Sequence, residues 1–370
     1  MAKVKIQGNA SGTGVLTVTA PNTSTDRTIT LPDSSGTILD NTSTLDATKL
    51  SGNLPALNAS SLTNVPKDVT VGGRKNEIQN GDFRINQRGA QSWPHSYQFS
   101  SDRWQNRTGS NVTWSHNTSS FPDGFTVSAE CDAAGSTAQM IELDATGKHG
   151  RFASGSTYTL SCWSTVVPTS LVTFSSSYGP ENSNDWTGDG VMTSTGETSN
   201  GFTKYTQTLT VSSSINAAAT GVFVKISGGS AFKFTGVQLE KGSTATDFEY
   251  RSYGEELALC QRYYERFIAD ASAEMLIGVG VNASATGVFI NYPYKQIKRV
   301  IPSFSSSGAS HFERLTASWG AGSSISCQAN IATARLNMGG FPSSTIWNAT
   351  EVRITAAANN AHWFAFDAEL

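Results

Sequence analysis

The segment from Tyr178 to Trp186 combines the residue types that recognise sugars. Its sequence is Tyr-Gly-Pro-Glu-Asn-Ser-Asn-Asp-Trp, so two aromatic rings flank Asn182, Asn184 and Asp185. A flat ring stacks on the apolar face of a pyranose, while amides and carboxylates bond its hydroxyl groups. Asn, Gly and Pro are also ordinary turn residues, so the segment fits a ligand-binding loop and a plain surface turn equally.

Other aromatic residues could present a ring to a ligand in the same way. In the segment Tyr158-Thr-Leu-Ser-Cys-Trp, strand alternation places Tyr158, Leu160 and Cys162 on one face. Trp163 then lies on the opposite face, where it would bind a ligand or contact a covering loop or a neighbouring chain. The further candidates for glycan contact are Trp93, Tyr97, Trp319 and Trp347, whereas Trp363 is expected to be buried in the last strand.

Motifs for catalysis and for metal binding are absent from the sequence. No glycine-rich phosphate loop follows a strand, no Gly-x-Ser-x-Gly elbow occurs, and the five histidines are scattered. A glycosidase needs two carboxyl groups in a groove. Strand alternation favours solvent-facing positions for the paired acids of this chain, namely Glu130, Asp132, Glu142 and Asp144. The oxygen-rich residues 181–189 lack the spacing of a cation loop. We therefore expect no enzyme activity, no cofactor and no metal ion.

The composition narrows the class of protein. Hydrophobic residues make up 38% of the 370 residues and charged residues 15%, a balance typical of short strands joined by many turns. The formal net charge of -3 and the lack of a Lys/Arg block argue against nucleic acid as a partner. No signal peptide and no membrane span is evident, so we expect a chain made in a cytosol and not inserted in a membrane. The four cysteines are far apart and predict free thiols.

Residues 1–82 contain no Phe, Tyr, Trp or Cys. Strand signals at 15–19 and 27–31 precede a series of apolar residues spaced three to five apart, namely Leu45, Leu50, Leu54, Leu57, Leu62 and Val65. Neither a strand period nor a helix period fits this spacing, so such a chain can bury these side chains only against copies of itself. We predict an intertwined trimeric shaft. A disordered linker is the alternative that the Ser, Thr and Asn content favours.

The remainder of the chain predicts a mainly β fold. Alternating segments such as 125–129, 158–163, 205–211, 222–226 and 232–239 favour an antiparallel β-sandwich over about residues 76–253. Strands return from about residue 268 and predict a second sandwich, which ends in a strand over 361–366. A strand this close to the terminus is expected to be paired, and a neighbouring subunit could supply the partner.

One segment predicts a helix. Glu255–Phe267 places Leu257, Cys260, Tyr264 and Phe267 on one stripe. Its acidic residues lie at the start and its arginines near the end, as the helix dipole favours. We expect a helical connector at 254–267 between two β domains.

Several motifs resemble those of a known family. Residues 30–39, Thr-Leu-Pro-Asp-Ser-Ser-Gly-Thr-Ile-Leu, are similar to a strand–turn unit of fibre N-terminal regions, and residues 45–65 to a shaft repeat. Asn80–Gly89 with Ser101-Asp-Arg-Trp104 resembles the opening of a carbohydrate-binding-module-type jelly roll, and Gly236–Tyr250 resembles its close. Together these segments resemble bacteriophage tail-fibre proteins, particularly those of cyanobacterial and marine phages.

The resemblance implies a fibre of the virion, assembled in the host cytoplasm, that attaches without catalysis to a host surface glycan such as lipopolysaccharide. It implies residues 1–75 as a tail-attachment and shaft region, 76–253 as the jelly roll, 254–267 as the connector and 268–370 as a distal β tip. The expected partners are further copies of the chain in a homotrimer, a tail or baseplate protein and the host polysaccharide. The alternatives are a glycan-cleaving fibre, a purely structural tail component and a secreted lectin, and the lack of a signal peptide disfavours the last.

Jelly rolls of this type often hold a structural calcium ion through an acidic residue of the closing strand. This chain has Gly236-Val-Gln238 there, so the resemblance does not extend to that ligand. We expect the ion to be absent.

The first testable prediction is the stoichiometry. Because residues 1–82 lack the side chains for a core of their own, the protein should sediment near three times 39.3 kDa. Analytical ultracentrifugation at micromolar concentration checks this, and a stable monomer would contradict the shaft.

Overall fold

The computed structural model describes residues 11–15, 17, 24–26, 74–89, 97–108, 112–143, 152–176, 186–212, 219–316, 318–356 and 361–369. The chain divides into two units, Met1–Thr63 and Asn64–Leu370. The few described residues of the first unit are exposed. The motif at 30–39, the strand signal at 27–31 and the spaced leucines from Leu45 onward lie outside the described residues, so the trimeric shaft stays a prediction.

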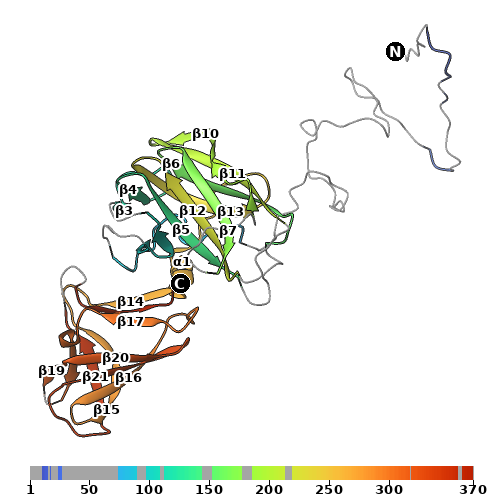
Figure 1. Ribbon diagram of the computed structural model, residues 1–370. Coiled ribbons are helices and arrows are strands. Elements are labelled where there is room, and N and C mark those ends of the chain that lie inside the picture. Colours follow the sequence, from blue (N-terminus) through green and yellow to red (C-terminus); the bar gives the residue numbers. More distant parts are fainter. Residues whose placement is uncertain are drawn as a thin grey trace. The chain divides into compact units, whose positions relative to one another are not determined.

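Two antiparallel sheets form a jelly-roll sandwich, as expected (Figure 1). The first sheet contains, in spatial order, β1 (Phe99–Ser101), β2 (Trp104–Asn106), β5 (Gly135–Glu142), β12 (Gly221–Gly228), β7 (Pro168–Ser175) and β9 (Gly190–Val191). The second contains β10 (Thr193–Ser199), β11 (Phe202–Val211), β6 (Thr157–Ser164), β13 (Phe232–Lys241), β4 (Ser128–Cys131) and β3 (Trp114–Asn117), with β8 (Trp186–Thr187) paired to β11.

Strand alternation builds the core between these sheets. Leu160 and Cys162 of β6 point into it, together with Val222 and Val224 of β12 from the other sheet. All four are fully buried. Alternate residues of β6 and β12 thus face the core, as the alternating sequence predicted.

Trp186 corrects an expectation. The sequence predicts an exposed loop at this position, but the Trp186 side chain is only 4% exposed and belongs to the core of the jelly roll. Its ring lies 5.5 to 5.8 Å from the rings of Phe152, Tyr158 and Phe174. A ring so enclosed cannot stack on a ligand from solution.

The helix is shorter than the sequence predicted. The helix α1 spans Tyr253–Gln261 and begins at Ser252, whose hydroxyl accepts a hydrogen bond from the backbone N–H of Glu255. Tyr264 and Phe267 are not on a helical stripe, because they lie in the strand β14 (Tyr264–Ile268). Long-range strand pairing has overridden the helical pattern here.

A second, C-terminal sandwich follows the helix. Its smaller sheet has the order β14, β23 (Trp363–Asp367) and β17 (Ser303–Ser306). Its larger sheet contains β19 (Trp319–Ala321), β18 (Phe312–Leu315), β22 (Ala349–Ile354), β15 (Met275–Ser284), β16 (Gly287–Pro293), β21 (Thr333–Gly339) and β20 (Ser324–Ala329), and a short 3-10 helix spans Ala309–His311. Phe364 and Phe366 of the smaller sheet pack with Ile290, Leu336 and Val352 of the larger one.

The last strand is paired within its own chain. Phe364 is opposite Phe267 of β14 on one side and Ser306 of β17 on the other. The expected pairing of this strand is confirmed, but both edges of β23 are occupied by strands of its own chain and not by a neighbouring subunit.

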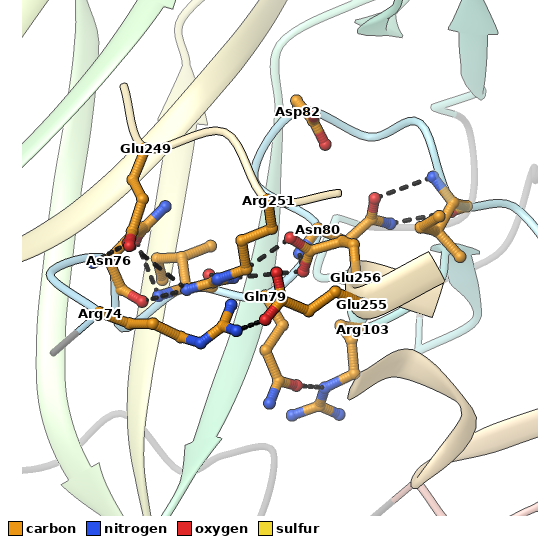
Figure 2. Close-up of polar contacts among 12 residues, drawn as sticks. Arg74, Asn76, Gln79, Asn80, Asp82, Arg103, Glu249, Arg251, Glu255 and Glu256 are labelled. Atoms are coloured by element: carbon orange, nitrogen blue, oxygen red, sulfur yellow. Dashed lines mark hydrogen bonds and ion pairs between the residues drawn. The ribbon is translucent and has the colours of Figure 1, made fainter. Parts of the chain in front are cut away.

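A buried polar network joins the opening of the jelly roll to its close (Figure 2). The guanidinium of Arg251 donates hydrogen bonds to both carboxylate oxygens of Glu256, at 3.2 and 3.3 Å, and to the carbonyl oxygens of Asn76 and Ile78. Glu256 also accepts a 2.6 Å hydrogen bond from the backbone N–H of Asn80. The network therefore ties the start of the jelly roll to the segment that follows its last strand.

Asn80 explains why the opening motif needs an amide. Its φ of 51° is in the left-handed region, which Asn tolerates better than most residues. Its side-chain Nδ2 donates to the carbonyl oxygens of Ile85 and Asp102 at 2.8 and 3.0 Å, and its Oδ1 accepts from the N–H of Ile85 at 2.9 Å. The turn is thus closed by one side chain.

Trp186→Ala should lower the free energy of unfolding by about 3–5 kcal/mol, the usual cost of removing a large aromatic side chain from a core. Trp186→Phe should cost much less, because a ring remains and, within the described residues, the indole N–H has no hydrogen-bond partner to lose. Urea unfolding of both variants measures this. An Ala variant as stable as the parent would show that the ring is not in the core.

Candidate functional site

A cleft of about 770 Å³ lies where the jelly roll meets the smaller sheet of the C-terminal sandwich. The jelly-roll side is formed by the opening segment and by the first two strands. The other side is formed by β14, β17, β23 and the residues after β23. The residues that line the cleft are Arg88, Tyr97, Gln98, Phe99, Gln105, Tyr264, Arg266, Ser303, Trp363, Asp367 and Glu369.

Strand alternation supplies the C-terminal wall of the cleft. Because Phe364 and Phe366 point into the core of the C-terminal sandwich, Trp363 and Asp367 lie on the opposite face of β23. Both are half-buried and both line the cleft. Trp363 is therefore less buried than the sequence analysis expected, although its strand was predicted correctly.

Arg88 is the centre of charge in the cleft. Its guanidinium lies 3.1 Å from Asp367 Oδ2, 3.6 Å from Glu369 Oε1 and 4.0 Å from Asp102 Oδ1. It also lies over the ring of Tyr264, 3.7 Å from the centroid. Burial opposes the charge of Arg88, but the three carboxylates outweigh burial and raise its pKa.

Aromatic rings border this charged centre. The guanidinium of Arg266 lies 4.5 Å from the ring centroid of Trp363, and Arg266 donates a 2.6 Å hydrogen bond to the carbonyl oxygen of Arg88. Tyr97 is 66% exposed and has a φ of 66°. The cleft therefore combines aromatic rings, each with an arginine guanidinium over one face, with a guanidinium–carboxylate pair.

The chain end helps to close the cleft. Glu369, whose side chain is 2% exposed, is bound by the guanidinium of Arg103 and accepts a 3.1 Å hydrogen bond from the Arg103 backbone N–H. The Arg103 guanidinium also lies 3.4 Å from the ring centroid of Tyr263 and donates a 2.8 Å hydrogen bond to Gln79. The Arg103–Gln79 bond is visible in Figure 2.

Asp102 is fully buried behind Arg88. Burial raises the pKa of its carboxyl to about 7, despite the opposing effects of Arg88 and of a 2.7 Å hydrogen bond from the Gln87 amide. Its ionisation near neutral pH therefore occurs inside the structure, away from solvent.

Among the described residues that were predicted to contact a glycan, Tyr97 is the one that lines the cleft. Trp163 is 9% exposed and lies opposite the core-facing residues of β6, as alternation predicted. It is covered by Phe125 and Phe202, which supports the covering-loop alternative. Trp186 is in the core.

Two further candidates lie elsewhere in the C-terminal sandwich. Trp319 is half-buried under the guanidinium of Arg353, 3.9 Å from its ring centroid, and Trp347 is 76% exposed with a φ of 70°. The remaining candidates, Trp93, Tyr178, Asn182, Asn184 and Asp185, lie outside the described residues.

Sequence reasoning missed most of the cleft. Arg88 and Arg266 were considered only as parts of a motif and of a predicted helix, and Asp367, the partner of Arg88, lies far away along the chain. The alternation of 363–367 was the one available signal, because it separates Trp363 and Asp367 from the two core phenylalanines.

The polar groups near Gln238 do not fit a calcium ion. The amide Nε2 of Gln238 donates a 2.8 Å hydrogen bond to Glu240, and the ammonium of Lys75 donates to Thr246 and to the carbonyl oxygen of Asp247, both at 2.5 Å. The ammonium of Lys75 and the amide of Gln238 thus donate hydrogen bonds to the oxygen atoms that would have to bind the ion. In the described parts of the chain, no group of three or more His, Cys, Asp or Glu could hold a metal ion. None of the described helices is long and apolar enough to cross a membrane.

No family model and no curated protein matches the chain. The enzymatically active domain of tailspike protein 4 from bacteriophage CBA120 aligns with 45% of this chain at 16% identity and a TM-score of 0.29. The alignment spans 21% of that domain, about a fifth of its length. The CBM22-1–CBM22-2 tandem domain from the N-terminus of Paenibacillus barcinonensis Xyn10C aligns with 76% of this chain and 97% of its own length, at 11% identity and a TM-score of 0.25. Similarities this low do not identify a function.

Asp102→Asn should change how stability depends on pH. The carboxyl has an ordinary pKa of 3.8 and a pKa of about 7 when folded, so the folded chain holds the proton more tightly. The stabilisation of the folded state by this tightly held proton is fully present below pH 3.8 and is lost as the pH rises through about 7. Each pKa unit corresponds to about 1.4 kcal/mol.

Relative to the parent, the Asn variant should therefore gain unfolding free energy between pH 4 and pH 7.5. Urea unfolding of both proteins at the two pH values measures the difference. Other carboxylates such as Glu142 are present in both proteins, so their contributions to the pH dependence cancel in the comparison. A difference between variant and parent that does not change with pH would contradict the assignment.

Proposed function

We propose that the protein is a tail-fibre component of a bacteriophage that attaches the virion to a bacterial surface glycan. The observation that carries the proposal is the cleft, in which Trp363 and Tyr97 border the ion pair of Arg88 and Asp367. The resemblance of the opening and closing motifs to fibre jelly rolls supplies the setting of a virion.

The chemistry of the cleft suits a sugar. A half-buried indole offers a flat face, and the guanidinium and carboxylate can donate to and accept from neighbouring hydroxyl groups without moving. Ion pairs hold both charged groups in place before the ligand arrives, which lowers the entropic cost of binding.

Binding without cleavage is the form of the proposal that the carboxyl groups support. A glycosidase needs a protonated carboxyl in contact with the glycosidic oxygen. Asp102 has the raised pKa for that role but is completely buried, and Glu369 is bound by Arg88 and Arg103. Neither group can reach a bound sugar as an acid, and Asp367, which lines the cleft, is ion-paired with Arg88.

We further propose that the first unit joins the fibre to a tail or baseplate protein and that three chains act together. Weak contacts at each cleft then add through avidity, so that three sites on one fibre hold a surface that a single site would release. A protein that joins the tail to the host surface in this way would be located in the tail of the virion.

Trp363→Ala should weaken binding of the full-length protein to immobilised lipopolysaccharide, tested over a panel of bacterial strains. Loss of one stacking contact should lower the affinity per site by about tenfold or more, corresponding to about 1.4 kcal/mol. Surface plasmon resonance measures it, with retention of the parent's circular dichroism as the folding control.

Trp347→Ala is the matched comparison, because Trp347 is the most exposed tryptophan of the described residues and lies outside the cleft. Binding that survives Trp363→Ala and disappears with Trp347→Ala would transfer the site away from the cleft. Release of reducing sugar from a bound polysaccharide would instead favour the glycan-cleaving alternative.

A further inference from the structure

The larger sheet of the C-terminal sandwich has an apolar outer face. Leu276, Val279 and Val281 of β15 and Phe289 of β16 are exposed by 54%, 63%, 43% and 38%. Large apolar residues gathered on one face of a soluble protein mark a contact surface. We call this set the outer apolar face.

The strand register shows that these residues share one face. Val281 is directly opposite Phe289 in the pairing of β15 with β16, and the next residue of β16, Ile290, points into the core. Val279 is two residues from Val281 along β15, so it lies on the same face, and it too is exposed to solvent. The core of the C-terminal sandwich thus occupies one side of the sheet, and the outer apolar face the other.

Opposite charges flank the outer apolar face. Arg335 of β21 lies beside it, with its guanidinium 4.6 Å from the ring centroid of Phe289. Glu351 of β22 lies on the other side, directly opposite Val279. In the sheet order β22, β15, β16, β21, the apolar centre lies between Glu351 on one border and Arg335 on the other. Arg353, which is also on the β22 border and is opposite Leu276, is paired with Glu274 and Glu313, so that border is acidic on balance.

We propose that the outer apolar face is the contact between copies of this chain, with three such sheets turned toward a common threefold axis. In that arrangement the basic border of each sheet meets the acidic border of the next, so Arg335 of one chain lies near Glu351 of its neighbour. The apolar centres are then buried against one another around the axis. This charge complementarity favours a second copy as the occupant over an unrelated protein.

The proposal does not depend on glycan binding, since none of these residues lines the cleft. It would give the C-terminal sandwich its own contribution to the trimer, in addition to the shaft expected from residues 1–75. The clefts would then be repeated around the axis in a fixed arrangement.

A paired-cysteine variant of the full-length protein tests the proposal. Within one chain, β22 and β21 are three strand spacings apart, about 14 Å, which is far beyond the roughly 7 Å limit for a disulfide between Cα atoms. Arg335→Cys with Glu351→Cys can therefore form a disulfide only between chains. After mild oxidation, we expect a covalent trimer of three times 39.3 kDa on a non-reducing denaturing gel.

Each single variant is a matched control and should migrate as one chain, which also accounts for the four native cysteines. A double variant that stays at the mass of one chain after full oxidation would overturn the proposal. A covalent dimer as the final product would also overturn it. In a dimer with twofold symmetry, both disulfides form between the same two chains and no third chain can be linked.

Discussion

The structure depends on one buried guanidinium, that of Arg103. It binds the side chain of Gln79 in the opening segment, the carbonyl oxygen of Met140 in β5, the ring of Tyr263 after the helix and the carboxylate of Glu369. The side chains of Arg103 and Glu369 are each 2% exposed. Removing Glu369 would leave the buried charge of Arg103 without a carboxylate, which typically costs several kcal/mol. Removing Arg103 would leave Glu369 with Arg88 alone.

The cleft follows from this constraint. Glu369, held by Arg103, is also one of the carboxylates that surround Arg88, and Arg88 in turn positions Asp367 at the cleft wall. Arg88 and Asp367, which line the cleft, are thus held in place by the buried residues Glu369 and Arg103. A site built in this way is rigid before binding, which suits recognition of a repeated surface by many weak contacts.

Local patterns in the sequence predicted the parts of the fold that depend on local rules. Alternation placed Leu160 and Trp163 on opposite faces, and the aromatic-rich end of the chain is a strand. The predicted helix failed after Gln261, because Tyr264 pairs with Asp367, a partner about a hundred residues away. The same kind of long-range contact, invisible to any local period, assembles the cleft.

The segments that resemble the opening of a jelly roll contain residues that support the fold. Asn80, Asp102 and Arg103 belong to the quoted opening segments, and all three are buried supports of the fold. Trp186 was misjudged because a tryptophan next to Asn and Asp looks like a loop residue, whereas its ring fills the core from the edge of a sheet.

The most direct measurement is a crystal structure of the full-length protein with an oligosaccharide released from a surface polysaccharide that it binds. We predict a sugar ring in the cleft, stacked on Trp363, with its hydroxyl groups bonded to Arg88 and Asp367. A sugar bound elsewhere on the chain, with the cleft empty, would contradict the assignment of this cleft as the site of attachment.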